Sequence, residues 1–75
     1  TSIVLRSDHG GAGLLEVFDL AGRRHWRERF EAPPGRHALT WRGRDGAGRA
    51  LPTGVYLYRV SLPDGTDSGR MVLAR

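Results

Sequence analysis

The residues that could carry chemistry in this chain are three histidines, eight acidic residues and a glycine-rich corner around Asp45. The segment 45–48 has a superficial likeness to a calcium loop, but a calcium site needs several oxygen ligands at alternate positions and a closing bidentate acid. Only Asp45 is acidic there, and Arg42, Arg44 and Arg49 flank it. We therefore interpret Asp45 as opening an Asx-turn, in which its carboxylate accepts a hydrogen bond from the backbone N–H two residues on.

Motifs for catalysis are absent from the sequence. Ser, His and Asp all occur, but there is no G-x-S-x-G nucleophile motif and no phosphate-binding G-x-x-x-x-G-K loop. His9 is expected in an exposed loop and His37 within a strand, each without ligand partners at useful spacing. A chain of 75 residues offers no deep cleft in which a pair of acids could be tuned for glycosidase chemistry. We expect no enzyme activity, no catalytic residue, no metal site and no cofactor.

Arginines and aromatic residues are the candidates for contact with a partner. All 12 basic residues are arginine and the formal net charge is +4, but the arginines are spread along the chain, which favours solvated strand faces over a nucleic-acid site. Within the segment 23–30, Trp26, Glu28 and Phe30 share one face. Either Glu28 pairs with an arginine on a neighbouring strand, or the two aromatics are partly exposed and form a contact surface. The predicted partner contacts are Trp26, Arg27, Arg29, Phe30, Arg70 and Arg75.

The composition is that of one folded domain, residues 1–75. Hydrophobic residues make up 39% and charged residues 27% of the chain, which is typical of a globular domain. No cysteine is present, so no disulfide and no thiolate site can form. No apolar run approaches the roughly 20 residues that cross a bilayer, so we expect no membrane insertion. The chain begins at Thr1 without an initiator methionine, and we expect it to be an excised domain, a processed product or a segment without its neighbours in a longer chain.

Alternation of apolar and polar residues predicts short strands, and no stretch has a helical period or an internal repeat. The predicted strands are residues 1–7, 14–20, 23–30, 36–41, 49–51, 55–62 and 68–74. A loop is expected at 8–13 and a hairpin turn at Asp64–Gly65. Asp19, Gly22, Asp45, Gly48 and Gly54 are expected to shape turns. Seven short strands with frequent turns predict an all-β, immunoglobulin-like (Ig-like) antiparallel β-sandwich.

The predicted core consists of apolar residues that alternate along these strands. Trp41 is expected to anchor it, with its indole N–H bound to an acceptor. The predicted core residues are Leu15, Val17, Leu39, Trp41, Tyr56, Tyr58, Val60, Met71 and Leu73.

Six segments carry a recognisable pattern: residues 15–23, 34–37, 41–45, 48–51, 53–60 and 70–73. In this order and at this spacing, they resemble the FlgD-like immunoglobulin domain of secreted bacterial proteins, and they are similar to the C-terminal sorting domains of the type IX secretion system. The family has an acidic or amide residue where this chain has Arg42, and an aliphatic residue near His25. The resemblance implies a β-sandwich, which in this family is appended to many kinds of exported protein.

The resemblance implies a non-catalytic accessory module of an exported protein, located outside the cell or on its surface. Such a module would act as a C-terminal sorting or attachment signal, a spacer or a docking surface, with the parent polypeptide, secretion machinery or like subunits as partners. For sorting, the expected recognition element is the last strand, residues 70–75. Two alternatives remain. The first is a self-assembling filament subunit that accepts a strand at an open sheet edge. The second is a carbohydrate- or nucleic-acid-binding module that uses Trp26, Phe30 and the arginines, although the spread of the arginines along the chain disfavours nucleic acid as a partner.

Overall fold

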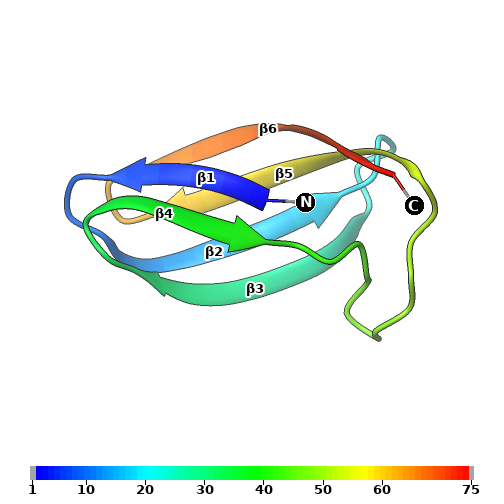
Figure 1. Cartoon of the computed structure of the whole chain (residues 1–75), viewed down its shortest axis with the longest axis horizontal. Helices are drawn as coiled ribbons and strands as arrows, with labels where there is room; N and C mark the ends of the chain where they lie inside the picture. The colour runs from blue at the N-terminus through cyan, green and yellow to red at the C-terminus, as the bar shows by residue number, and fades with distance from the viewer. Residues whose placement is uncertain (1, 75) are drawn as a thin grey trace.

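The computed structural model describes residues 2–74, which form six β-strands and no helix. The strands are β1 (Ser2–Ser7), β2 (Gly11–Phe18), β3 (Arg24–Ala32), β4 (Gly35–Thr40), β5 (Gly54–Leu62) and β6 (Gly65–Leu73). β1 and β4 form a two-stranded sheet, and the other four form a sheet in the order β3-β2-β5-β6. All pairings are antiparallel. The two sheets face each other in a sandwich-like arrangement (Figure 1). The described residues therefore contain no helix that could cross a bilayer.

The core lies between the two sheets, because inward-facing residues alternate along each strand. Trp41, Leu15, Val17 and Val60 are its most completely buried large side chains. The Trp41 indole N–H donates to the carbonyl oxygen of Arg44 at 3.0 Å. Of the nine predicted core residues, all are buried except Tyr58, which is half-buried and packs against the others. The core also contains residues that were not predicted from the sequence: Ile3, Leu5, Ala32 and Leu51.

The predicted strand at residues 49–51 is not formed, so the described chain has six strands and not seven. Only an isolated bridge joins Arg44 to Ala50, and the Leu51 N–H donates to the Gly43 carbonyl oxygen at 2.8 Å. The long loop between β4 and β5 therefore folds on itself at one end of the sandwich (Figure 1). The prediction that Gly54 shapes a turn is also wrong, because Gly54 is the first residue of β5 and pairs with Leu73.

β2 begins three residues earlier than predicted, because glycines do not end the strand at this point. Gly11 and Gly13 pair with Ala32 and Phe30 of β3. The Phe30 ring occupies the space above Gly13 in which a side chain would otherwise lie. An aromatic ring over a cross-strand glycine keeps the sheet packed. The same relationship recurs between Tyr58 of β5 and Gly69 of β6.

Two turns share one pentapeptide pattern, Asp-x-Ala-Gly-Arg, at residues 19–23 and 45–49, so the expectation of no internal repeat is wrong at this scale. In both turns the Asp Oδ1 accepts hydrogen bonds from the backbone N–H groups of the third and fifth residues at 2.9–3.0 Å. In both, Asp Oδ2 accepts from the Arg Nε at 3.0 Å. Gly22 and Gly48 take left-handed φ angles of 89° and 83°. The repeated sequence therefore encodes a repeated turn.

The two pentapeptide turns meet through His25 at the start of β3. The His25 Nε2 lies 2.8 Å from Asp19 Oδ2, and the His25 carbonyl oxygen accepts a hydrogen bond from the Gly46 N–H at 3.0 Å. This contact stabilises the end of the sandwich where the long loop leaves β4.

Candidate functional site

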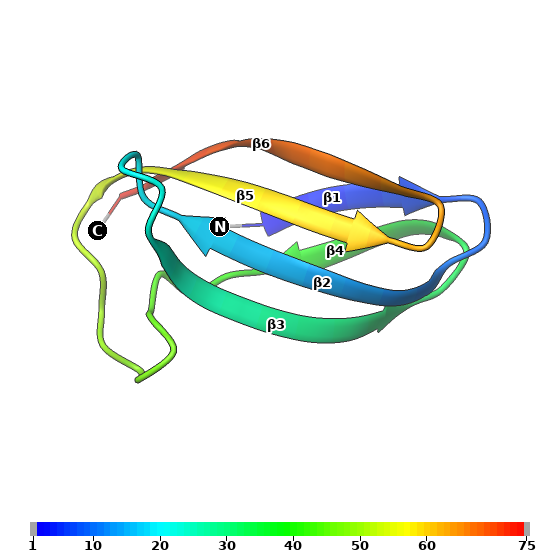
Figure 2. The same ribbon diagram turned by 180° about the vertical axis from the view of Figure 1, so that it is seen from behind.

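The outer face of the four-stranded sheet gathers five arginines from three strands. Glu16 of β2 lies opposite Arg27 of β3 on one side and Arg59 of β5 on the other, and residues opposite one another in an antiparallel pair share a face. Because Leu15 and Val17 point into the core, Glu16 and its row point outward. Figure 2 views the molecule from the side of this sheet. We call this surface the arginine face; its arginines are Arg24, Arg27, Arg29, Arg59 and Arg70.

Glu16 is the centre of an ion-pair network on the arginine face. Its carboxylate accepts hydrogen bonds from Arg59 at 2.8 and 3.1 Å and from Arg24 at 3.0 Å. The two arginines cover it, so only 5% of Glu16 is exposed although it lies on an outer face. The Arg59 hydrogen bond, with Arg24, lowers the pKa of this carboxyl against the opposing effect of burial. The carboxylate therefore stays ionised and holds two guanidinium groups in place.

Apolar side chains lie between the arginines of this face. Phe18 of β2 is opposite Leu57 of β5, which in turn is opposite Arg70 of β6. The Arg59 guanidinium lies over the Phe18 ring, 5.4 Å from its centroid. Val72, which follows on the same face of β6, is 63% exposed. The arginine face thus combines fixed positive charge with exposed apolar area.

Arg27, Arg29 and Arg70 are exposed and form no ion pair with the acidic residues of the described range, 2–74. By contrast, Arg24 and Arg59 share Glu16, and Arg23 and Arg49 are held by the aspartates of their turns. The guanidinium groups of Arg27, Arg29 and Arg70 are therefore available for a partner.

The sequence predicted Arg27, Arg29 and Arg70 as partner contacts, and the structure brings them onto one face. Trp26 and Phe30 lie on the opposite face of β3, as the alternation along the strand predicts; they point toward the core and are half-buried. Trp26 pairs with Val17, and Phe30 stacks on His37 with ring centroids 5.9 Å apart. The predicted partner contacts therefore lie on two different faces and stay a prediction, and Arg75 lies outside the described residues.

Glu28 does not form the predicted ion pair with an arginine of a neighbouring strand among residues 2–74; its Oε1 accepts a hydrogen bond from the Trp26 indole N–H at 3.2 Å. Beside this pair is a recess of about 410 Å³ between β3 and the long loop. Its other lining residues are Thr40, Trp41, Arg42, Arg44 and Gly48. This recess is the place where a carbohydrate ligand would meet Trp26, and that alternative stays a prediction.

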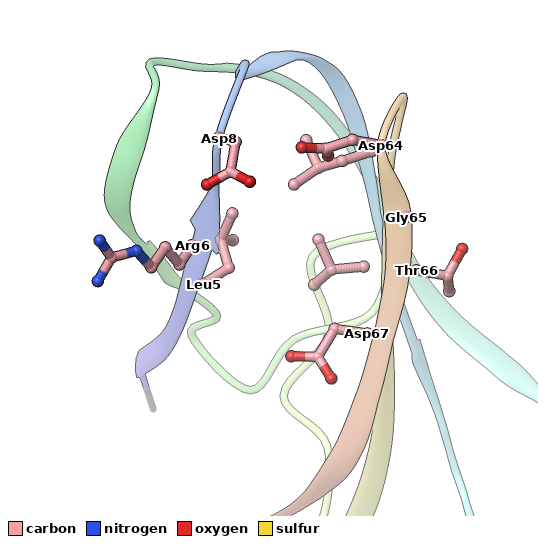
Figure 3. Close-up of a pocket in the computed structure, with 9 residues that line it drawn as sticks. Leu5, Arg6, Asp8, Asp64, Gly65, Thr66 and Asp67 are labelled. Carbon is pink, nitrogen blue, oxygen red and sulfur yellow. The ribbon is translucent and has the colours of Figure 1, made fainter.

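A second depression, of about 400 Å³, lies between β1 and the β5–β6 hairpin. Leu5 points into it, and the carboxylates of Asp8, Asp64 and Asp67 are directed toward it, whereas the Arg6 guanidinium points away (Figure 3). Both Asp64 oxygens accept from the Ser7 hydroxyl, at 3.1 and 2.9 Å. The Ser7 hydroxyl and the backbone N–H groups of Asp8 and His9 lower the pKa of Asp64. The hydrogen bonds between Ser7 and Asp64 therefore connect β1 of one sheet to the β5–β6 turn of the other; we call this contact the Ser7–Asp64 joint.

Among residues 2–74, no three His, Cys, Asp or Glu side chains are grouped so that they could hold a metal ion. No family model, curated protein or solved structure matches the chain.

Glu16 and Ser7, the two buried polar residues among residues 2–74, were not predicted from the sequence. Alternation along β2 places Glu16 on the side of the strand that faces away from the core. Its burial depends on the arginine side chains of β3 and β5 that cover it. Asp64 lies 57 residues from Ser7, so no local pattern connects them. The repeated pentapeptide turn, however, could have been found in the sequence.

Proposed function

We propose that this chain is a non-catalytic, Ig-like accessory module of an exported bacterial protein, and that it attaches to another protein through the arginine face. The observation that carries the proposal is the placement of Arg27, Arg29 and Arg70, without acidic partners in the described chain, on one face of the four-stranded sheet. Exposed charged residues without a structural partner are candidates for binding.

Two further features support an accessory role. The ordered motifs that resemble the FlgD-like immunoglobulin domain lie on the sandwich-like scaffold and its turns, including the repeated pentapeptide. In addition, β6 is an edge strand of its sheet and supplies Arg70 to the arginine face. The expected sorting element at residues 70–75 would thus start within the proposed attachment surface; Arg75 itself is outside the described residues.

The test is the size and location of the native polypeptide. An antibody raised against this 75-residue chain should detect, in the extracellular or surface fraction of the producing cells, a band much larger than the 8.3 kDa of the chain. A band near 8.3 kDa would contradict an accessory module, and a band confined to the cytoplasm would contradict export.

A self-assembling subunit is a second candidate, favoured by the two edges of the four-stranded sheet. Because four strands alternate in direction, the edge strands β3 and β6 run antiparallel. A second copy could therefore add its β3 to β6 in an antiparallel ladder without reversing its orientation, and such head-to-tail contacts extend into filaments. However, β3 carries Arg27, Arg29 and Glu31, and charged side chains on an edge strand oppose this pairing. Sedimentation equilibrium at high protein concentration distinguishes a filament subunit from a monomer.

A further inference from the structure

We propose that the partner of the arginine face is an acidic protein surface with an apolar centre. This inference rests on the proposed function, because it names the chemistry of the partner that the same face would bind. It is carried by four properties of the face: its unbalanced charge, the spacing of its arginines, the apolar side chains between them, and the fixed position of Arg59.

The arginine face carries excess positive charge, because its five arginines face only two carboxylates, Glu16 and Glu31. Of its five arginines, Arg24 and Arg59 share the single carboxylate of Glu16. Arg27, Arg29 and Arg70 form no ion pair with a carboxylate among residues 2–74. Arginine binds carboxylates through two parallel N–H···O hydrogen bonds, so a surface that displays Asp and Glu complements these groups in both charge and geometry.

The spacing of these arginines fits a surface better than a small ion. Arg27 and Arg29 are two residues apart on β3, so their backbones are about 7 Å apart. Arg70 lies on β6, three strand spacings away, which is about 14 Å. Arg27 and Arg29 are close enough to share one phosphate or sulfate, but the three guanidinium groups together cover an area wider than one such ion. They can each meet a different acidic side chain of a macromolecule.

The apolar residues favour a protein over a nucleic acid. Phe18, Leu57 and Val72 lie among the arginines, and Val72 is 63% exposed. Burying such side chains stabilises a complex only if the partner also presents apolar atoms. The backbone of a nucleic acid presents phosphates instead, and it gains nothing from Val72 or Leu57. Arginine and aromatic residues beside aliphatic ones are typical of protein–protein interfaces.

The network around Glu16 prepares the face for binding. Glu16 accepts two hydrogen bonds from Arg59, and the Arg59 guanidinium lies over the Phe18 ring. β2 and β5, which carry these residues, are the two central strands of the sheet. Side chains that are already ordered lose less conformational entropy when a partner binds. The centre of the face is therefore rigid, and Arg27, Arg29 and Arg70 remain at its periphery to select the partner by charge.

The experiment measures binding of three labelled probes to the whole 75-residue chain by fluorescence anisotropy. The first probe is a peptide of about 20 residues composed of Glu, Asp, Leu and Phe, which presents the two chemistries of the proposed partner. The second replaces its acids by Gln and Asn. The third is a single-stranded DNA of similar charge. Each is titrated at about 50 and 150 mM salt, because screening separates purely electrostatic binding from binding with an apolar component.

The test variant is R27Q/R29Q/R70Q, and the matched control is R6Q/R36Q/R42Q. Both remove three exposed positive charges, but Arg6 and Arg36 lie opposite each other on β1 and β4, away from the arginine face. We expect the test variant to weaken binding of the acidic peptide at least about tenfold and the control less than about threefold. Val72→Ser should weaken the acidic peptide by about threefold or more and leave any binding of DNA unchanged. Circular dichroism of each variant verifies that it is folded.

Three results would overturn the inference: tighter binding of DNA than of the acidic peptide, equal losses in the test and control variants, or no binding of the acidic peptide at either salt concentration. None of these results concerns the size or location of the native polypeptide. An accessory module with another kind of partner is therefore distinguishable from a failure of the proposed function itself.

Discussion

The Ser7 hydroxyl of β1 binds the Asp64 carboxylate in the β5–β6 turn, and this contact joins the two sheets across 57 residues of chain. The Ser7 oxygen also accepts a hydrogen bond from the Gly10 N–H at 2.9 Å. Ser7 is only 4% exposed and Gly10 is buried, so the Ser7 hydroxyl and the Gly10 N–H depend on each other, whereas Asp64 is exposed. This contact closes the end of the sandwich beside the depression shown in Figure 3.

Ser7→Ala should lower the free energy of unfolding by about 1–2 kcal/mol, because it leaves the buried Gly10 N–H without its acceptor. Urea denaturation measures the change. Ser68→Ala, at an exposed position of β6, is the control and should change the stability by less than about 0.5 kcal/mol. Equal effects of the two substitutions would show that the joint contributes nothing.

The same joint predicts a pH dependence. The pKa of Asp64 is lowered in the folded chain, chiefly by the Ser7 hydroxyl. A carboxyl whose pKa is lower when folded than when unfolded stabilises the fold above the ordinary carboxyl range, and this stabilisation is lost as the pH falls through that range. The stability difference between wild type and Ser7→Ala should therefore shrink in acid. Thermal melts between neutral and acidic pH measure it, and a difference that grows in acid would contradict the assignment.

Gly10→Ala should be among the most damaging small substitutions in the chain. Gly10 is buried with a φ of 69°, and a Cβ there would collide with backbone atoms of Ala32, Pro33 and Pro34. Backbone atoms cannot rotate away as a side chain can, so we expect a loss of about 2 kcal/mol or more in urea denaturation. Gly46→Ala is the matched control, because nothing lies within 4 Å of its Cβ position. A tolerated Gly10→Ala would disprove the close approach.

Glu16→Gln should destabilise the fold by about 1–3 kcal/mol, because Arg24 and Arg59 lose their shared carboxylate. Both arginines are about half exposed, so solvent screening favours the lower end of that range. The pKa of Glu16 is lowered, so the advantage of wild type over the variant should be lost as the pH falls through the ordinary carboxyl range. Glu31→Gln, at an exposed position of β3, should have little effect in the same urea series.

The two pentapeptide turns give a matched comparison. Asp19→Ala and Asp45→Ala should each lower the melting temperature, and Asp→Asn at either position should lower it less, because the amide oxygen can still accept from the two backbone N–H groups. Asp19→Ala should be the more damaging, because Asp19 Oδ2 also lies 2.8 Å from His25 Nε2. Differential scanning calorimetry gives the order. If Asn were no better than Ala, the backbone hydrogen bonds would not be the stabilising feature.

Local patterns predicted most of the strands, because the alternation of inward and outward residues is a property of each segment alone. The pattern wrongly predicted a strand at residues 49–51. Leu51 is buried there, but its N–H donates to the Gly43 carbonyl oxygen within the same loop. It was also misleading at Gly13, because the opposing Phe30 ring supplies the packing that glycine lacks. In both places a residue from elsewhere in the fold decided the local structure.

The sequence by itself determined the two pentapeptide turns. In each turn the Asp19 or Asp45 carboxylate binds backbone N–H groups of the same five residues, and Gly22 or Gly48 takes the left-handed φ. It also determined that Trp26 and Phe30 share a face with Glu28. Only the tertiary structure decided that this face is the inner one, because the choice depends on the register of β3 against Val17 and Gly13 of β2. Likewise, the burial of Glu16 requires guanidinium groups that strand pairing brings from 8 and 43 residues away. Side chains so far apart in sequence become one surface only when antiparallel hydrogen bonding sets their strands side by side.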